Sequence, residues 1–222
     1  MIEKSIDAKE VMVECFLDIE GAFDKTSFEC IYDAALRRGI HNRTCGWIRT
    51  TLESRTIKTR LAEEELEVVA AKGCPQGGVL SPLLWSLVVD DLLVMLEGDG
   101  FKVQGYADDV AILIGGKFEE TVSERLQVAL NIVSRWCVGI GLNINPKKST
   151  IVAFTRRRSR ARLQKPTLCG ETIEYSNEVK YLGLTIDEKL NWNAHLDRVT
   201  EKASISLWTS RSLYGKNWGI SP

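Results

Sequence analysis

Apolar and polar residues follow two periods along the chain, and each period predicts one kind of secondary structure. Residues 11–17 (VMVECFL) form a β-rich apolar run, which predicts a buried strand that ends at Asp18. Residues 26–38 carry apolar side chains at helical spacing and precede a glycine, which is typical of a helix end. In residues 55–69 apolar and polar side chains alternate, which predicts a hairpin with an acidic turn of three glutamates.

The second half of the chain continues the same alternation of helices and strands. Residues 82–97 are apolar nearly all round, which predicts a deeply packed helix with Ser81 as its N-cap and Pro82 at its first position. Residues 101–114 are expected to form a hairpin. Thr121 and Glu124 have the spacing of a capping box that opens an amphipathic helix. Further elements follow in order: strands at residues 151–154 and 178–186, and a separable helical tail from residue 191.

The order of these elements predicts an α+β fold. A strand, a helix, an insertion, a helix, a hairpin, a helix and a strand are best accommodated by an antiparallel sheet with helices on one face. With 222 residues, the chain suits one domain, with or without a small appendage.

Composition is that of an ordinary globular protein, with 44% hydrophobic and 27% charged residues. The formal net charge of −1 creates no overall attraction toward nucleic acid. Residues 146–165, in contrast, contain eight lysines and arginines and no acid. Such a run is either a solvated loop or a patch that contacts phosphates.

The cysteines, histidines and tryptophans add little chemistry of their own. The six cysteines include no C-x-x-C pair, which argues against zinc and predicts reduced core thiols. His41 and His195 have no partner spacing and are assigned no catalytic role. Trp192 and Trp208 are candidates for stacking on nucleic acid. The first residues resemble no signal peptide, and residues 79–96 are too short to span a bilayer, so we expect an intracellular protein of the nucleus or cytoplasm.

Paired acids are the strongest candidates for chemistry. Asp108 and Asp109 lie between two apolar runs, where unpaired charge is unfavourable unless a cation such as Mg²⁺ shares the site. Asp-Asp is also ordinary turn chemistry, so both interpretations stay open for this stretch alone. If the strand ending at Asp18 lies beside this hairpin, the three carboxylates could hold two Mg²⁺ ions about 3.5–4 Å apart for in-line phosphoryl transfer.

Residues 72–78 (KGCPQGG) form a glycine-rich loop ahead of the apolar helix. The loop lacks the G-x-x-x-x-G-K-[ST] pattern, which excludes a P-loop. Gly77 would allow the backbone to approach a nucleotide closely, and Gln76 offers an amide for hydrogen bonds. A tight turn before a helix is the alternative interpretation.

Five stretches in this order resemble the conserved motifs of reverse transcriptases from non-LTR (LINE-type) retrotransposons, with most similarity to jockey-like insect elements. The stretches are residues 16–25 (FLDIEGAFDK), 73–84 (GCPQGGVLSPLL), 106–109 (YADD), 141–149 (GLNINPKKS) and 180–184 (KYLGL). Together they cover about residues 11–190.

The resemblance implies a role for each matching residue. Asp18 and Asp108 match the two catalytic metal-binding acids, with Asp109 as a third carboxylate and the carbonyl of Ile19 as a further ligand. Two Mg²⁺ ions, with Mn²⁺ as a substitute, would be the cofactors. Phe23 matches the bulky residue that excludes the sugar 2′-hydroxyl. The remaining matches are Gln76, Gly77 and Lys147 or Lys148 for nucleotide binding, and Tyr181, Leu182 and Gly183 for the primer grip.

The same resemblance implies a polymerase palm with an RRM-like sheet, formed by residues 1–43 and 73–187. Residues 44–72 would be a residual fingers insertion and residues 188–222 the start of a helical thumb. The implied activity is RNA-directed DNA polymerase, with an RNA template, a DNA primer and dNTP as partners and no membrane; oligomeric state is left open.

The chain begins close to the first motif, so we expect a fragment or a degenerate copy. An inactive nucleic-acid-binding remnant is therefore the main alternative. A palm-fold nucleotidyl cyclase is a further one, although it has no use for the primer-grip strand.

Overall fold

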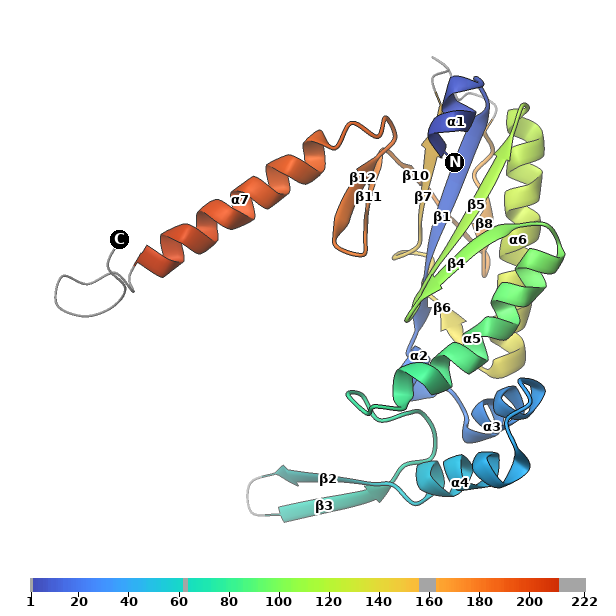
Figure 1. Cartoon of the computed structure of the whole chain (residues 1–222), viewed down its shortest axis with the longest axis vertical. Helices are drawn as coiled ribbons and strands as arrows, with labels where there is room; N and C mark the ends of the chain where they lie inside the picture. The colour runs from blue at the N-terminus through green and yellow to red at the C-terminus, as the bar shows by residue number, and fades with distance from the viewer. Residues whose placement is uncertain (1, 62–63, 156–162, 212–222) are drawn as a thin grey trace.

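A computed structural model describes residues 2–61, 64–155 and 163–211. Its centre is a six-stranded sheet with the order β10-β7-β1-β5-β4, in which β6 pairs with β1 beside β7 (Figure 1). The central strand β1 (Val11–Glu20) is antiparallel to β5 (Asp109–Gly116) and to β7 (Thr150–Phe154). The hairpin strand β4 (Lys102–Tyr106) forms one edge, and β10 (Tyr175–Ser176) forms the other as the one parallel pairing among the described strands. The two-residue strand β6 (Asn143–Ile144) pairs with the last two residues of β1.

Two long helices cover one face of this sheet, α5 (Ser81–Gly98) and α6 (Glu119–Ile140) (Figure 1). Alternate residues of β1 point toward them, because side chains along a strand alternate between faces. Val13, Cys15 and Leu17 are buried in the main hydrophobic cluster together with Leu126 and Leu130 of α6. This arrangement confirms the predicted α+β fold with helices on one face of an antiparallel sheet.

The opposite face of β1 carries a second, smaller hydrophobic cluster around Met12 and Phe16. It is covered by the short helix α1 (Ile2–Asp7) and by a hairpin of β11 (Glu178–Tyr181) and β12 (Leu184–Asp187). The predicted single strand over residues 178–186 is thus wrong. Leu182 and Gly183 both adopt positive φ angles, 47° and 81°, which reverse the chain between β11 and β12.

Three helices follow β1 and lead to a second hairpin. They are α2 (Ala22–Lys25), α3 (Phe28–Arg37) and α4 (Asn42–Glu53). The hairpin of β2 (Thr56–Leu61) and β3 (Glu64–Val69) confirms the predicted one and extends away from the sheet (Figure 1). A small hairpin of β8 (Thr167–Leu168) and β9 (Glu171–Thr172) lies beside α6. The basic residues 156–162 of the predicted phosphate patch and residue 63 of the acidic turn lie outside the described residues.

The structure corrects two predicted helix starts. Leu80, not Ser81, is the N-cap residue of α5, because the Ser81 hydroxyl instead donates a hydrogen bond to the Pro75 carbonyl in the preceding loop. The predicted capping box at Thr121 is also wrong. Helix α6 begins at Glu119, so Thr121 already lies inside it.

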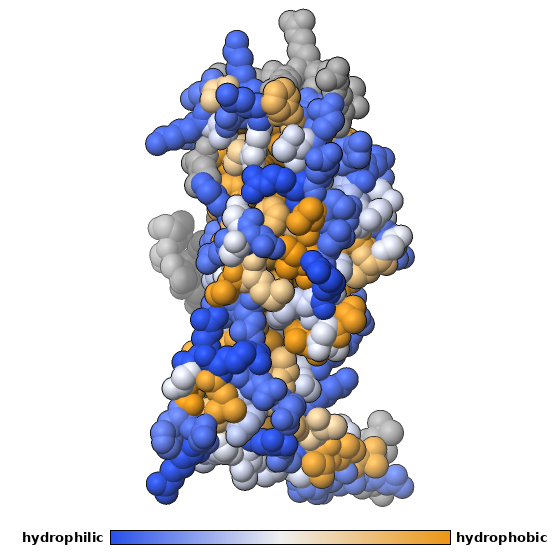
Figure 2. All heavy atoms as spheres, turned by 90° about the vertical axis from the view of Figure 1, so that its right-hand side faces the viewer, coloured by the Kyte–Doolittle hydropathy of each residue, from blue (hydrophilic) through white to orange (hydrophobic). Residues whose placement is uncertain are grey.

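Helix α5 is not packed on all sides, contrary to the prediction from its composition. Leu92 and Leu96 are fully buried, but Val94 and Met95 on the same helix are about half exposed, at 50% and 48%. The side of the molecule shown in Figure 2 is largely hydrophilic and carries separate hydrophobic patches. Such scattered apolar residues are normal on a protein surface.

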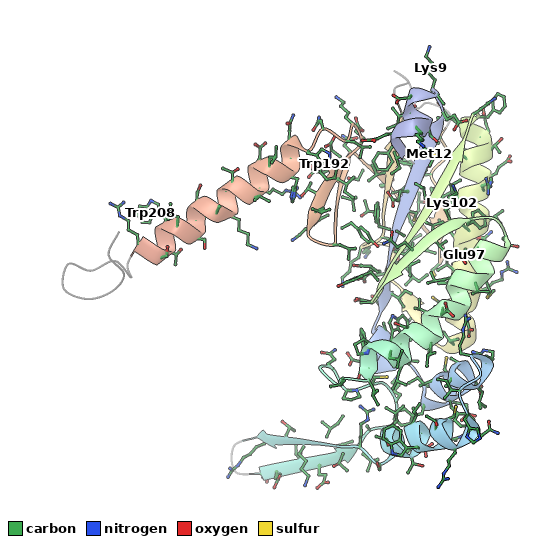
Figure 3. All side chains as sticks on the ribbon, viewed as in Figure 1. Lys9, Met12, Glu97, Lys102, Trp192 and Trp208 are labelled. Carbon is green, nitrogen blue, oxygen red and sulfur yellow. The ribbon has the colours of Figure 1, made fainter. Side chains whose placement is uncertain are left out.

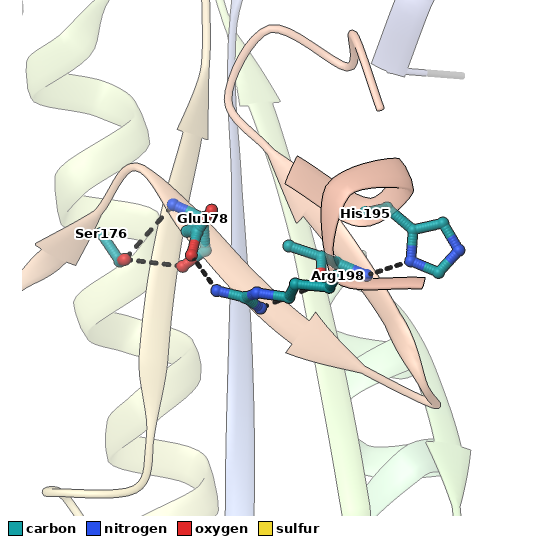
Figure 4. Close-up of polar contacts among 5 residues, drawn as sticks. Ser176, Glu178, His195 and Arg198 are labelled. Atoms are coloured by element: carbon teal, nitrogen blue, oxygen red, sulfur yellow. Dashed lines mark hydrogen bonds and ion pairs between the residues drawn. The ribbon is translucent and has the colours of Figure 1, made fainter. Parts of the chain in front are cut away.

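The C-terminal helix α7 (Asn193–Ser210) confirms the predicted helical tail and projects from the sheet (Figure 1). None of its residues is buried. Trp192 lies at its start and Trp208 near its end (Figure 3), with 43% and 76% exposure. Polar contacts join α7 to the β11–β12 hairpin: Arg198 pairs with Glu178, and Thr185 N–H donates to His195 Nδ1 (Figure 4).

Among the described residues, no helix has both the length and the apolar character needed to cross a membrane. All six cysteines are free thiols, and four of them are buried, as predicted for core residues. Cys169 is exposed and departs from that prediction.

Candidate active site

Three aspartates lie at the same end of the central strand pair. Asp18 of β1 and Asp109 of β5 are directly opposite each other in the antiparallel register. Asp108 occupies the turn that precedes β5, and its carbonyl accepts a hydrogen bond of 3.4 Å from the Ile19 N–H. Strand β1 continues for two residues beyond Asp18, so this acid lies within the strand and not at its end as predicted.

The electrostatics of Asp109 reflect this grouping. Its pKa is raised above the ordinary value, first by burial and then by the negative charges of Asp108 and Asp18. A carboxylate whose pKa is raised by burial and by neighbouring negative charges is a feature of sites that bind cations or move protons. A positive charge near Asp109 would therefore be stabilised by the carboxylates around it.

The turn before β5 holds an unusual backbone conformation. Ala107 has a φ of 52°, in the left-handed region that residues other than glycine seldom adopt. The indole Nε1 of Trp85 in α5 donates a hydrogen bond of 2.5 Å to the Ala107 carbonyl. A buried helix residue thus fixes the turn that carries Asp108 and Asp109, which is how strained conformations persist at functional sites.

A second turn, after β6, brings a lysine to the acids. The Asn145 N–H donates to the Asp18 carbonyl at 3.1 Å, and the Asn145 side chain accepts hydrogen bonds from the N–H groups of Lys147 and Lys148. The Lys148 ammonium lies 3.6 Å from the Asp18 carboxylate. Of the two lysines that the sequence left equivalent, Lys148 is the one paired with an acid of this group.

A groove of about 880 Å³ is lined by Asp18 and Asp109 but not by Asp108. Its lining includes Asp18, Asp109, Lys147 and Lys148. It also includes residues of β10 and β11 and two further acids, Glu174 just before β10 and Glu178 at the start of β11. The groove therefore has both carboxylates and lysine ammonium groups on its walls.

Tyr181 lies on the wall of the same groove. Its ring packs on Phe16 of β1, with ring centroids 4.9 Å apart. Its hydroxyl is buried and has no hydrogen-bond partner among the described residues. Burial raises the pKa of Tyr181, and the charges of Asp109 and Glu14 raise it further. The adjoining turn at Leu182 and Gly183 is exposed at the hairpin tip.

Phe23 and the glycine-rich loop form a second part of the site. The Phe23 ring packs near Trp85, with centroids 6.3 Å apart, which is the same tryptophan that fixes the Ala107 turn. The Cys74 N–H donates to the Phe23 carbonyl at 2.6 Å. Gln76 and Gly77 are exposed in this loop and do not line the groove. The predicted site residues thus fall into two groups that Trp85 connects.

The donor set of the acidic group suits a hard divalent cation, since it consists of carboxylate oxygens. Among the described residues, however, no three acidic, cysteine or histidine side chains converge into a preformed metal cluster. Lys148 lies where it neutralises Asp18. Binding of a cation by these acids would therefore require the side chains to turn and Lys148 to give way.

Comparison with known proteins decides the family. The family described as "Reverse transcriptase (RNA-dependent DNA polymerase)" matches residues 4–186. The chain belongs to this reverse transcriptase family.

Similar proteins come from non-LTR retrotransposons of insects. This reverse transcriptase chain is 26% identical over 97% of its length to the "Putative 115 kDa protein in type-1 retrotransposable element R1DM" of Drosophila melanogaster. It is 28% identical over 89% of its length to the "RNA-directed DNA polymerase from mobile element jockey" of the same species. The chain spans only 21% and 22% of these two proteins, respectively.

Solved structures of telomerase share the fold of this reverse transcriptase chain. Apo telomerase from Candida tropicalis superposes with a TM-score of 0.56 at 12% identity, over 86% of this chain and 34% of that one. Telomerase from Candida albicans in complex with a fragment of telomeric RNA gives a TM-score of 0.55 over 86% of this chain and 33% of that one, also at 12% identity. These similarities show a palm-type polymerase fold, as the sequence motifs predicted.

Sequence reasoning assigned no role to three residues that shape the site. Asp24 accepts a hydrogen bond from Gln76, Trp85 holds the Ala107 turn, and Asn145 organises the lysine turn. Asp24 directly follows Phe23 in the first motif and Asn145 belongs to the fourth, so their places in the motifs were a usable signal. Trp85 offered no such signal, because one tryptophan in an apolar helix is typical of a core residue.

Proposed function

We propose that this chain is the catalytic core of an RNA-directed DNA polymerase that transfers a nucleotide from dNTP to a primer 3′-hydroxyl with the help of two divalent cations. The observation that carries the proposal is the position of Asp18, Asp108 and Asp109 at the same end of the β1–β5 pair, beside the Lys148 ammonium. Membership of the reverse transcriptase family supports the reaction class.

Asp18, Asp108 and Asp109 would hold the cations, together with the carbonyl of Ile19. Two Mg²⁺ ions, or Mn²⁺ in their place, supply charge neutralisation at the attacking and leaving oxygens when they are bound. The raised pKa of Asp109 supports this assignment, because a bound cation would offset both the burial of its charge and the nearby charges of Asp108 and Asp18 that raise it. Lys148, released from Asp18, would then be free to contact the triphosphate, with Lys147 beside it in the groove.

Phe23, Gln76 and Gly77 would bind the incoming nucleotide. The packing of Phe23 on Trp85 fixes the ring relative to the acidic turn, which suits a residue that excludes the sugar 2′-hydroxyl by its bulk. Gly77 has a φ of 79°, so its loop reaches a conformation that larger residues seldom adopt. Rigid placement of such groups is what positions a substrate for in-line transfer.

Tyr181, Leu182 and Gly183 would hold the primer end. Tyr181 places the hairpin on Phe16, two residues from Asp18 on the same face of β1. The exposed turn at Leu182 and Gly183 lies next to it and would lie against the primer strand. An RNA template and a DNA primer are therefore the proposed partners.

The parts of a polymerase hand follow from this assignment. Residues 1–43 and 73–187 would form the palm, residues 44–72 a fingers insertion and residues 188–222 the start of the thumb. Residues 212–222 of that last segment lie outside the described residues.

A nucleic-acid-binding remnant without catalysis is the second candidate. The pairing of Lys148 with Asp18 and the lack of a preformed metal cluster among the described residues favour it. The two candidates differ in one measurable property, template-dependent incorporation.

The test is primer extension on an RNA template with Mg²⁺ and deoxynucleotides. We expect incorporation by the wild-type chain, loss of at least about 100-fold in Asp108→Asn because a carboxylate ligand of the cation is removed, and no change in Asp33→Asn, an exposed acid on α3. Incorporation that survives Asp108→Asn would contradict the assigned site. Binding of template and primer without any incorporation by the wild type would favour the remnant.

A further inference from the structure

Asp24 contacts the side chain of Gln76, which the proposed function places at the nucleotide. The Gln76 Nε2 amino group donates a hydrogen bond of 2.9 Å to Asp24 Oδ2. An ionised carboxylate can only accept hydrogen bonds, so only the amino end of the carboxamide can face it. The Oε1 acceptor at the other end of the carboxamide therefore remains free to face a ligand, and so does the second amino hydrogen.

The hydrogen bond between Asp24 and Gln76 is not what holds the loop in place. The Gly73 N–H donates to the Thr26 carbonyl at 2.7 Å, and the Cys74 N–H donates to the Phe23 carbonyl at 2.6 Å. These two backbone bonds fix the base of the loop to the turn that follows β1. The effect of the Asp24 carboxylate is therefore on the orientation of the Gln76 carboxamide, whose amino group it binds.

Gly73 reinforces the contact between the loop and this turn. Its φ is 80°, and a Cβ at this position would lie 2.5 Å from the Asp24 carbonyl oxygen. Real Cβ atoms essentially never approach backbone so closely. The loop is thus packed directly on residue 24. This packing keeps the Gln76 side chain within hydrogen-bonding distance of the Asp24 carboxylate.

We propose that Asp24 is a positioning residue that presents Gln76 to the incoming nucleotide as a hydrogen-bond acceptor. This inference rests on the proposed function and adds the chemistry of one contact. A phosphate oxygen only accepts hydrogen bonds and would be repelled by Oε1, whereas a sugar hydroxyl donates. The group of the nucleotide that Oε1 contacts is therefore a donor such as a sugar hydroxyl, and not a phosphate oxygen.

An exchange of the two side-chain types tests the polarity of this contact. Gln76→Glu alone places a second carboxylate beside Asp24, and we expect the KM for dNTP to rise about tenfold, the effect of losing about 1.4 kcal/mol of binding. Asp24→Asn alone frees the carboxamide to turn either way, so we expect a smaller rise in KM. In both variants kcat should stay within about twofold of wild type.

The double variant Asp24→Asn with Gln76→Glu should restore the KM to within about twofold of wild type. The new asparagine amide donates to the new glutamate, an acceptor again faces outward, and the pair keeps its single negative charge. If Gln76 instead acted through its amino group, the double variant would stay as impaired as Gln76→Glu. That outcome, or a fall in kcat at unchanged KM, would overturn the proposal. Asp33→Asn is the matched control.

A second measurement separates this proposal from the proposed function. The side-chain amide signals of Gln76 in a ¹⁵N-labelled chain without nucleotide should move in Asp24→Asn and stay in place in Asp33→Asn. Identical signals in wild type and Asp24→Asn would overturn the proposal whatever the activity. Signals that move, in a wild-type chain that incorporates no nucleotide, would show that the contact forms but that the proposed function fails, and with it the role in nucleotide binding.

Discussion

Glu14 is a carboxylic acid half-buried in an apolar layer, and its titration should be visible in the stability of the whole chain. It lies on β1 between Leu113 of β5 and Val152 of β7, on the face that carries Met12 and Phe16. No described residue gives it a hydrogen bond or an ion pair. Burial raises the pKa of Glu14 from 4.5 to about 7.

The size and sign of the effect follow from this one shift. The gap between a pKa of 4.5 in the unfolded chain and about 7 in the folded chain corresponds to about 3 kcal/mol. Because the folded state binds the proton more tightly, the contribution of Glu14 to stability is fully present below pH 4.5. It is lost as the pH rises through about 7. Above that pH the carboxylate is ionised in an apolar environment.

Glu14→Gln removes the titrating group while keeping the shape of the side chain. We expect the variant to gain stability relative to wild type at pH 8, and this gain to exceed any change at pH 5 by about 2 kcal/mol. Urea unfolding of both proteins at the two pH values measures the difference. Glu124→Gln, an exposed acid on α6, is the control and should show no pH-dependent gain. A Glu14→Gln effect of the same size at pH 5 and pH 8 would refute the reasoning.

Three further substitutions test individual contacts. Gly73→Ala should destabilise the chain by more than about 2 kcal/mol, because the position has a φ of 80° and the new Cβ would clash with the Asp24 carbonyl. An unchanged melting temperature would contradict this prediction. Tyr181→Phe removes a buried hydroxyl without a described partner, so thermal melting should show equal or slightly higher stability, and a loss above about 1 kcal/mol would reveal a hidden partner. Trp85→Phe loses the hydrogen bond to the Ala107 carbonyl, so the free energy of unfolding in urea should fall by about 1–3 kcal/mol. Most nucleotide incorporation should be lost as well. Full incorporation would show that this hydrogen bond does not position the acids.

Local patterns predicted the strands and helices because burial of β1 and α6 depends on which residues repeat at period 2 or 3.6. Predictions failed where a distant residue decides the local structure. The Ser81 hydroxyl bonds to the Pro75 carbonyl and not to its own helix, which no helix-start pattern anticipates. A second failure is local, because the positive φ of Leu182 divides a run of residues that the sequence pattern predicted as one strand.

The candidate site was predictable in its residue types but not in its contacts. Asp109 follows Asp18 by 91 positions, so their pairing depends on the register of two distant strands, which could be stated from the sequence only as a condition. The choice between Lys147 and Lys148 depended on the turn that Asn145 organises. Glu14 lay within a predicted buried strand, but alternation alone does not tell whether a charged residue meets solvent or a second apolar layer.

The central claim is that Asp18, Asp108 and Asp109 bind two divalent cations together with nucleotide. The most direct measurement is the number of Mn²⁺ ions bound, by electron paramagnetic resonance, to the chain with RNA template, a DNA primer lacking a 3′-hydroxyl and the matching dNTP. The account predicts about two ions for wild type and Asp33→Asn, and at most about one for Asp18→Asn and Asp108→Asn. An unchanged number of bound ions in both site variants would contradict it.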